Sequence, residues 1–168
     1  LPIYVAFDSA DTWASPELFQ FTTEHIPTAV AGCPPDAFSA TGQLWGNPVY
    51  NWEYHRQTGF DWWIRRIRNS LKWYDVIRID HFRGFDEFYA VPYGNPTAEN
   101  GSWQKGPGMD LFRAVWERLG KVAIIAEDLG YLTDSVKALL KETGFPGMKV
   151  LQFAFDSRDF SDYLPHTY

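Results

Sequence analysis

The stretch Val76-Ile77-Arg78-Ile79-Asp80 constrains the fold most, because two charged side chains interrupt an otherwise apolar run. Its β-branched residues and strict alternation predict a buried strand. A two-residue period puts Val76, Arg78 and Asp80 on one face of that strand, and Ile77 and Ile79 on the other. Charged groups at the end of an apolar strand are costly unless they pair or take part in chemistry. In α/β barrels, chemistry is located at the C-terminal ends of the strands.

A second apolar run, Val122 to Ala126, ends in the same way, with Glu127 and Asp128. Consecutive strands of a parallel barrel are neighbours, about 4.8 Å apart. Inward-facing Asp80 and Glu127 would then approach the ~5–5.5 Å that suits double displacement at a glycosidic bond. Arg78 is expected to keep Asp80 ionised as the nucleophile, while Glu127, with no cationic neighbour in sequence, would serve as the acid. The same residues also fit a buried structural ion pair, since strand-end carboxylates serve many purposes.

The remaining pattern predicts an α/β fold in which strands alternate with helices around a parallel sheet. Two further strands are expected at residues 3–7 and 148–155. Helices are expected at about 61–73, 109–119 and 133–143, where apolar residues recur at helical spacing and Gly120 and Gly144 act as stops. Residues 14–59 are expected to be irregular with short helical turns at most, and residues 86–108 to form a second long loop. Loops this long inside a compact domain are usually functional.

Composition excludes several classes of function. The net charge is −6, so nucleic acid and anionic membranes are not expected partners, and no stretch is apolar enough to span a membrane. The only cysteine, Cys33, suits a reducing compartment, and a cytoplasmic location is predicted. Aromatic residues make up 18% of the chain. We expect Trp62, Trp63, Trp73 and Trp116 to pack in the core, and the loop residues Trp45 and Trp103 to be better candidates for stacking on sugars.

Several long motifs resemble those of one enzyme family. The motifs are Arg78-Ile-Asp-His-Phe-Arg-Gly-Phe85, Ala126-Glu-Asp-Leu-Gly130, Pro34-Pro-Asp-Ala-Phe-Ser-Ala-Thr-Gly-Gln-Leu-Trp-Gly-Asn-Pro48, Asp8-Ser-Ala-Asp11 and Pro146-Gly-Met-Lys149. Together they resemble the amylomaltases, the 4-α-glucanotransferases of glycoside hydrolase family seventy-seven. The resemblance covers essentially the whole chain.

The resemblance implies specific roles. Asp80 corresponds to the nucleophile, Glu127 to the acid/base and Arg78 to a residue that supports Asp80, while His81 corresponds to a residue that binds a sugar hydroxyl. The donor site would include Asp8 and Asp11. The loop from Pro34 to Trp45 resembles the lid over the acceptor side, and its expected substrate contacts are Asp36, Phe38, Gln43 and Trp45. The implied substrates are maltooligosaccharides, with no cofactor and no metal.

The resemblance further implies part of a (β/α)₈ TIM barrel, about strands three to six with long βα loops. Residues 1–168 would form a partial catalytic domain, with 14–59 as an inserted loop or lid. The family's clan uses a third carboxylate, an Asp beside a His after strand seven. This chain has Asp156, Asp159 and Asp162 near its end but no His-Asp pair there. The segment by itself is therefore expected to be catalytically inactive.

Two other functions remain open on the sequence. A metal-dependent barrel hydrolase would use Asp80, His81, Glu127 and Asp128 as ligands. A non-catalytic glucan-binding module would use the aromatic residues for binding and the acids for structure.

Overall fold

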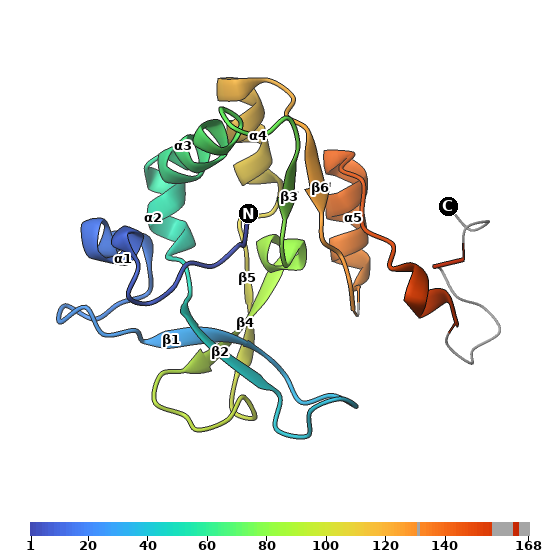
Figure 1. The fold of residues 1–168 in the computed structure, drawn as a ribbon. Coiled ribbons are helices and arrows are strands. Elements are labelled where there is room, and N and C mark those ends of the chain that lie inside the picture. The colour runs from blue at the N-terminus through green and yellow to red at the C-terminus, as the bar shows by residue number, and fades with distance from the viewer. Residues whose placement is uncertain (131, 156–162, 165–168) are drawn as a thin grey trace.

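A computed structural model describes residues 1–130, 132–155 and 163–164, and combines a parallel strand pair with an antiparallel sheet (Figure 1). The strands are β1 (Ala29–Cys33), β2 (Gln43–Pro48), β3 (Ile77–Ile79), β4 (Glu87–Pro92), β5 (Ser102–Lys105) and β6 (Ile124–Ala126). The α-helices are α1 (Ala10–Ala14), α2 (Trp52–Gln57), α3 (Asp61–Ser70), α4 (Met109–Leu119) and α5 (Asp134–Thr143). Short 3₁₀ helices lie at Pro16–Leu18, Phe82–Phe85 and Leu151–Phe155.

The predicted parallel neighbours are confirmed. Strand β3 pairs with β6 in parallel, with Ile77 opposite Ile124 and Ile79 opposite Ala126. The predicted faces of β3 are also confirmed, since Ile77 and Ile79 are buried and Arg78 is exposed. Helices α3, α4 and α5 lie around this pair (Figure 1). The arrangement is a mixed α/β fold consistent with part of a TIM barrel.

The two outer strands predicted at 3–7 and 148–155 are wrong, because neither range forms a strand. On one side Pro2 forms a parallel bridge with Asp80, and on the other the amide of Ala126 donates to the carbonyl of Pro146, 2.9 Å away. These contacts lie at the C-terminal ends of β3 and β6, and within the described residues the segments that follow pair with no strand. The chain therefore turns after Val5 into α1, and residues 151–155 form a 3₁₀ helix instead of a strand.

The helices follow their sequence signals closely. Helix α4 spans the expected residues and ends at Gly120, and α5 begins after Thr133, whose hydroxyl accepts a hydrogen bond from the amide of Val136. Gly144 ends α5 in the left-handed conformation that glycine adopts without strain. Helix α3 ends at Ser70, three residues before the expected end. Trp73 consequently lies beyond the helix and is 82% exposed, so its predicted place in the core is wrong.

The segments expected to be irregular contain an antiparallel sheet, and this is the main correction to the sequence analysis. Strands from residues 14–59 and 86–108 form one four-stranded sheet in the order β2-β1-β4-β5. Figure 1 shows the sheet beyond the ends of β3 and β6. These strands are short and interrupted, with a register shift between Val30 and Gly32, so no clear period marks them in the sequence. Gly32 lies so close to the carbonyl of Gln43 that a Cβ would collide with it.

The core is largely aromatic, as the composition suggested. Trp63, Phe82, Phe85 and Phe112 are fully buried. Phe85 links the helices, since its ring centroid lies 5.1 Å from that of Trp63 in α3 and 5.3 Å from that of Phe112 in α4. Trp62 is buried and Trp116 is partly buried, as expected. In the described part of the chain, no helix has both the length and the apolar character needed to cross a membrane.

We expect stability to fall between pH 6.5 and 4 because of His55. This side chain of α2 is fully buried among Tyr50, Trp52 and Trp62. Within the described residues, neither of its ring nitrogens has a hydrogen-bond partner of good geometry. Burial lowers the pKa of His55 from 6.5 to about 4, and the backbone of Leu18 offsets only part of that effect. The unfolded chain therefore takes up a proton before the folded one does as the pH falls. The contribution, about 3 kcal/mol, is present above pH 6.5 and is lost by pH 4.

Urea unfolding at several pH values measures this effect. Replacing His55 by Phe is expected to make the decline in unfolding free energy over that range less steep, while His81, whose pKa burial also lowers to about 4, and carboxyl groups still contribute to acid sensitivity. His25→Asn is the matched control, because His25 is exposed. Equal slopes for the wild type and His55→Phe would show that His55 does not carry the effect.

Candidate active site

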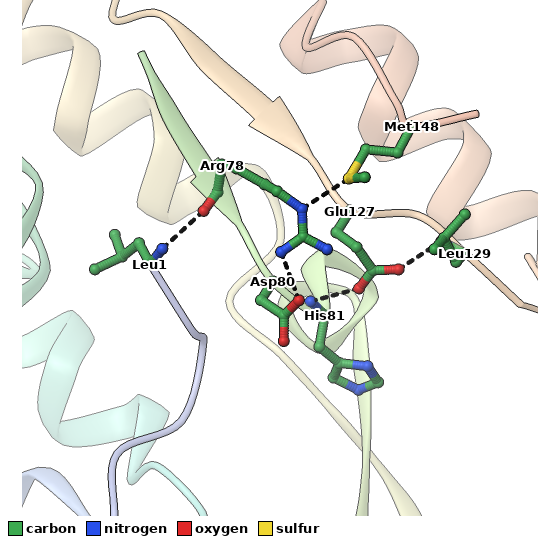
Figure 2. A network of polar contacts seen from close by, with 7 residues as sticks. All are labelled: Leu1, Arg78, Asp80, His81, Glu127, Leu129 and Met148. Atoms are coloured by element: carbon green, nitrogen blue, oxygen red, sulfur yellow. Dashed lines mark hydrogen bonds and ion pairs between the residues drawn. The ribbon is translucent and has the colours of Figure 1, made fainter. Parts of the chain in front are cut away.

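The end of β3 presents Arg78 and Asp80 on one face of the strand. Their side chains are 43% and 52% exposed, so the expected burial of this pair is not found in the described chain. The guanidinium Nη1 of Arg78 donates to Oδ1 of Asp80 at 2.7 Å, which confirms the predicted pairing. The Arg78 Nε–H points to the sulfur of Met148, 2.8 Å away (Figure 2). The side chain of Arg78 is thus held between Asp80 and Met148.

Glu127 follows β6 directly and is held by backbone groups. Its Oε2 accepts the amide N–H of His81 at 2.7 Å, and its Oε1 accepts that of Leu129 at 2.8 Å (Figure 2). The sequence analysis found no partner for this carboxyl, because backbone donors are invisible in a sequence. The His81 amide reaches Glu127 from a left-handed backbone conformation, with φ at 57°. That conformation is unusual for a residue other than glycine and often occurs at functional sites.

One cavity of about 310 Å³ brings the strand ends together. Of the predicted site residues, it is lined by Asp80, His81, Glu127 and Trp45. Gln43 lies beside it, since its side-chain oxygen accepts the indole N–H of Trp45 at 3.1 Å. Trp45 and Gln43 both belong to β2. The antiparallel sheet therefore delivers an aromatic wall to the carboxyl groups of the parallel strands.

The imidazole of His81 packs among aromatic rings. Its centroid is 4.8 Å from that of Trp45, with the ring planes perpendicular, and 6.2 Å from that of Tyr4. Gly84 allows this packing, because a Cβ there would come within 3.2 Å of the His81 ring and 2.8 Å of Ile3. Burial, with a smaller contribution from the charge of Arg83, lowers the pKa of His81 to about 4, whereas Asp80 acts in the opposite direction. The ring is therefore neutral at neutral pH.

The structure does not bring the other predicted residues to this cavity. Asp8 is exposed and does not line it. Asp11 lies at a different cavity, of about 450 Å³, and accepts the indole N–H of Trp62 at 3.3 Å. Asp36 shapes its own loop, with Oδ1 accepting the amides of Phe38 and Ser39, both at 2.8 Å. Phe38 stands at the tip of that loop and is 96% exposed.

Four residues that line this cavity were missed by the sequence analysis, namely Pro2, Ile3, Tyr4 and Asn47. Tyr4 is buried and packs its ring 6.1 Å from that of Tyr50. The Asn47 amide nitrogen donates to the carbonyl of Val5 at 2.9 Å, which ties β2 to the N-terminal segment. Asn47 belongs to the same motif as Gln43 and Trp45, so its position in that motif could have identified it as a site residue. Tyr4 carried no comparable signal.

The donor set of the metal-dependent alternative is not assembled in the structure. Among residues 1–130, 132–155 and 163–164, no group of three or more His, Cys, Asp or Glu side chains is arranged to hold a metal ion. Asp128, the fourth suggested ligand, instead accepts the amide of Met148 at 2.7 Å. The loop between β6 and α5 is thereby connected to the segment after Pro146.

Carboxyl groups at the ends of neighbouring parallel strands, gathered at one cavity, are consistent with the active-site end of an α/β barrel. Comparison with known proteins narrows that class. A family model described as 4-alpha-glucanotransferase, glycoside hydrolase family 77, matches residues 1–168. The chain therefore belongs to the 4-alpha-glucanotransferase family.

The chain spans about a third of the relatives it matches. It is 56% identical over 169 residues to the 4-alpha-glucanotransferase of Clostridium butyricum, covering 100% of this chain and 35% of that protein. It is 57% identical over 166 residues to the enzyme of Streptococcus pneumoniae, covering 99% and 33% respectively. The solved amylomaltase of Streptococcus agalactiae, in complex with acarbose, superposes with a TM-score of 0.96 at 50% identity, covering 100% of this chain and 34% of that one.

Proposed function

We propose that this chain supplies the nucleophile and the acid/base of a retaining 4-α-glucanotransferase acting on maltooligosaccharides. The observation that carries the proposal is the joint lining of one cavity by Asp80 and Glu127 at the ends of β3 and β6. Within the enzyme, the chain would form about strands three to six of a (β/α)₈ barrel. The family assignment supports this reading.

In the proposed first step, a carboxylate oxygen of Asp80 attacks the anomeric carbon of a bound glucan. The glycosidic C–O bond breaks, and Glu127 gives its proton to the departing oxygen. A covalent glucosyl ester of Asp80 remains. Arg78, 2.7 Å from Asp80, holds this carboxylate in one orientation before the attack.

In the second step, the hydroxyl of an acceptor glucan transfers its proton to Glu127 and attacks the same carbon. The ester bond to Asp80 breaks, which regenerates the carboxylate and completes transfer with retained anomeric configuration. Water competes with the acceptor for the intermediate. A cavity walled by Trp45 favours transfer, because aromatic surfaces exclude water and stack on sugars.

The proposed substrate contacts divide by position. His81 and Trp45 line the cavity, and the neutral imidazole of His81 can both donate to and accept from sugar hydroxyls. Gln43 and the exposed Phe38 would act from the acceptor side, with Asp36 holding the loop that presents Phe38. Neither Asp8 nor Asp11 lines this cavity, so these residues would bind only a part of the glucan that extends beyond it.

The proposed mechanism also requires the third carboxylate that the family's clan uses. The chain has Asp156, Asp159 and Asp162 after the last predicted strand but no His-Asp pair there, and these three residues lie outside the described residues. We propose that the required Asp comes from another part of a longer protein, since the relatives are about three times as long as this chain.

Incubation with maltotriose tests the function. We expect the complete enzyme, meaning this chain within the longer protein that the proposal implies, to release glucose together with longer maltooligosaccharides. The 168-residue chain alone is expected to do neither. Proton NMR at early times should show products with α-configured linkages. Hydrolysis without longer products would contradict transferase activity, and transfer by the isolated chain would contradict the need for a third carboxylate from elsewhere.

A further inference from the structure

Met148 has a polar contact that core packing does not explain. Its sulfur receives the Nε–H of Arg78 at 2.8 Å, and the same guanidinium gives its Nη1–H to Asp80 at 2.7 Å (Figure 2). Met148 is half-buried and belongs to neither hydrophobic cluster of the described residues. Filling a gap in the core, the usual reason for methionine in a protein interior, therefore does not account for its place.

The backbone around Met148 is held in place from the β6 side. The Met148 amide donates to Oδ1 of Asp128 at 2.7 Å, and Pro146 accepts the amide of Ala126 at 2.9 Å. Gly147 packs against the Asp128 carboxyl so closely that a Cβ would collide with it. These contacts fix the backbone of Met148 relative to β6, so that its side chain lies beside the C-terminal ends of β3 and β6.

We propose that Met148 is a positioning residue for the nucleophile, acting through Arg78. The arginine side chain has several rotatable bonds, and a single contact with Asp80 leaves the guanidinium free to change its orientation. A second contact at Nε restricts the guanidinium to the orientation in which Nη1 faces Asp80. This inference rests on the proposed role of Asp80 as the nucleophile.

The chemistry of the thioether suits this task. Sulfur in methionine is a neutral, weak hydrogen-bond acceptor. A carboxylate at the same place would compete with Asp80 for the positive charge of Arg78, whereas a thioether orients the group and leaves its charge to Asp80. The oxygen of a side-chain amide is also a neutral acceptor, so the flexible side chain of glutamine should serve in its place.

The test compares Met148→Leu, Met148→Gln and Met109→Leu in the complete enzyme. Leucine keeps an apolar side chain and removes the acceptor, and glutamine supplies a neutral one. Met109→Leu is the matched control, because Met109 is buried in α4 and does not line the cavity. We expect Met148→Leu to lower kcat for maltotriose disproportionation by about 3- to 10-fold, which corresponds to one net hydrogen bond, with KM and thermal midpoint nearly unchanged.

Met148→Gln is expected to restore most of the lost kcat, and Met109→Leu to match the wild type. A crystal structure of Met148→Leu should show Arg78 turned away from Asp80 or in more than one rotamer. The proposal is overturned if Met148→Leu keeps wild-type kcat, if Met148→Gln gives no recovery, or if Arg78 stays on Asp80 in the leucine variant.

Asp80→Asn, assayed in parallel, separates this inference from the proposed function. If Asp80→Asn is inactive while Met148→Leu is fully active, only the role of Met148 is wrong. If Asp80→Asn retains transfer, the nucleophile assignment is wrong and the role of Met148 fails with it.

Discussion

Replacing Asp80 by Asn is expected to lower kcat for glucan transfer by about 10⁴-fold or more, the scale seen when a nucleophile is removed. An amide cannot form the covalent ester, whereas its size and shape match those of the carboxyl. The amide oxygen can still accept from Nη1 of Arg78, and the side chain is half exposed, so folding and KM should change little. Initial rates of glucose release from maltotriose, with a thermal melt of each protein, measure both effects.

Asp61→Asn is the matched control for Asp80→Asn. Asp61 lies at the start of α3, and its carboxyl contacts Arg65 at 2.8 Å in an exposed i,i+4 pair. Losing that pair costs about 0.5 kcal/mol at most and should leave transfer intact. Transfer that survives in Asp80→Asn would favour the reading of this chain as a glucan-binding module whose acids are structural.

Replacing Glu127 by Gln is expected to lower transfer from maltotriose by about 10²- to 10⁴-fold, the usual contribution of a general acid/base. The loss should depend on the leaving group. Fluoride needs no protonation, so consumption of α-maltosyl fluoride should fall far less than consumption of maltotriose. Added azide should restore turnover of the fluoride donor, because azide attacks the covalent intermediate without a general base. Asp80→Asn should fail with both donors, and this contrast assigns the two roles.

The hydrogen bonds of Glu127 imply that Glu127→Gln also lowers the stability of the fold. Both oxygens of Glu127 accept backbone amides, from His81 and Leu129, so the NH₂ group of Gln would face a donor on one side. We expect a loss of about 1–2 kcal/mol in unfolding free energy. Glu53→Gln, at an exposed position of α2, is the control for the substitution itself. Equal losses with maltotriose and with the fluoride would show that Glu127 does not act as the acid.

Local patterns in the sequence determined the elements with strong internal signals. Alternation of apolar residues identified β3 and its faces, and helical spacing with Thr133, Gly120 and Gly144 identified α4 and α5. These features depend on neighbours along the chain, so they can be predicted without the tertiary structure. The motifs around Asp80 and Glu127 also indicated the family, which the comparisons confirm.

Only the tertiary structure decided how the antiparallel sheet pairs and which further side chains meet at the site. The antiparallel sheet contains strands from both predicted loops, and its pairing places residues far apart in sequence opposite each other, such as Ala31 and Ala90. The same holds at the site. Backbone amides hold Glu127, and Met148 reaches Arg78 across 70 positions of the chain. A sequence shows the type and spacing of its residues, but long-range pairing is set by the whole fold, because each contact depends on where every other segment has packed.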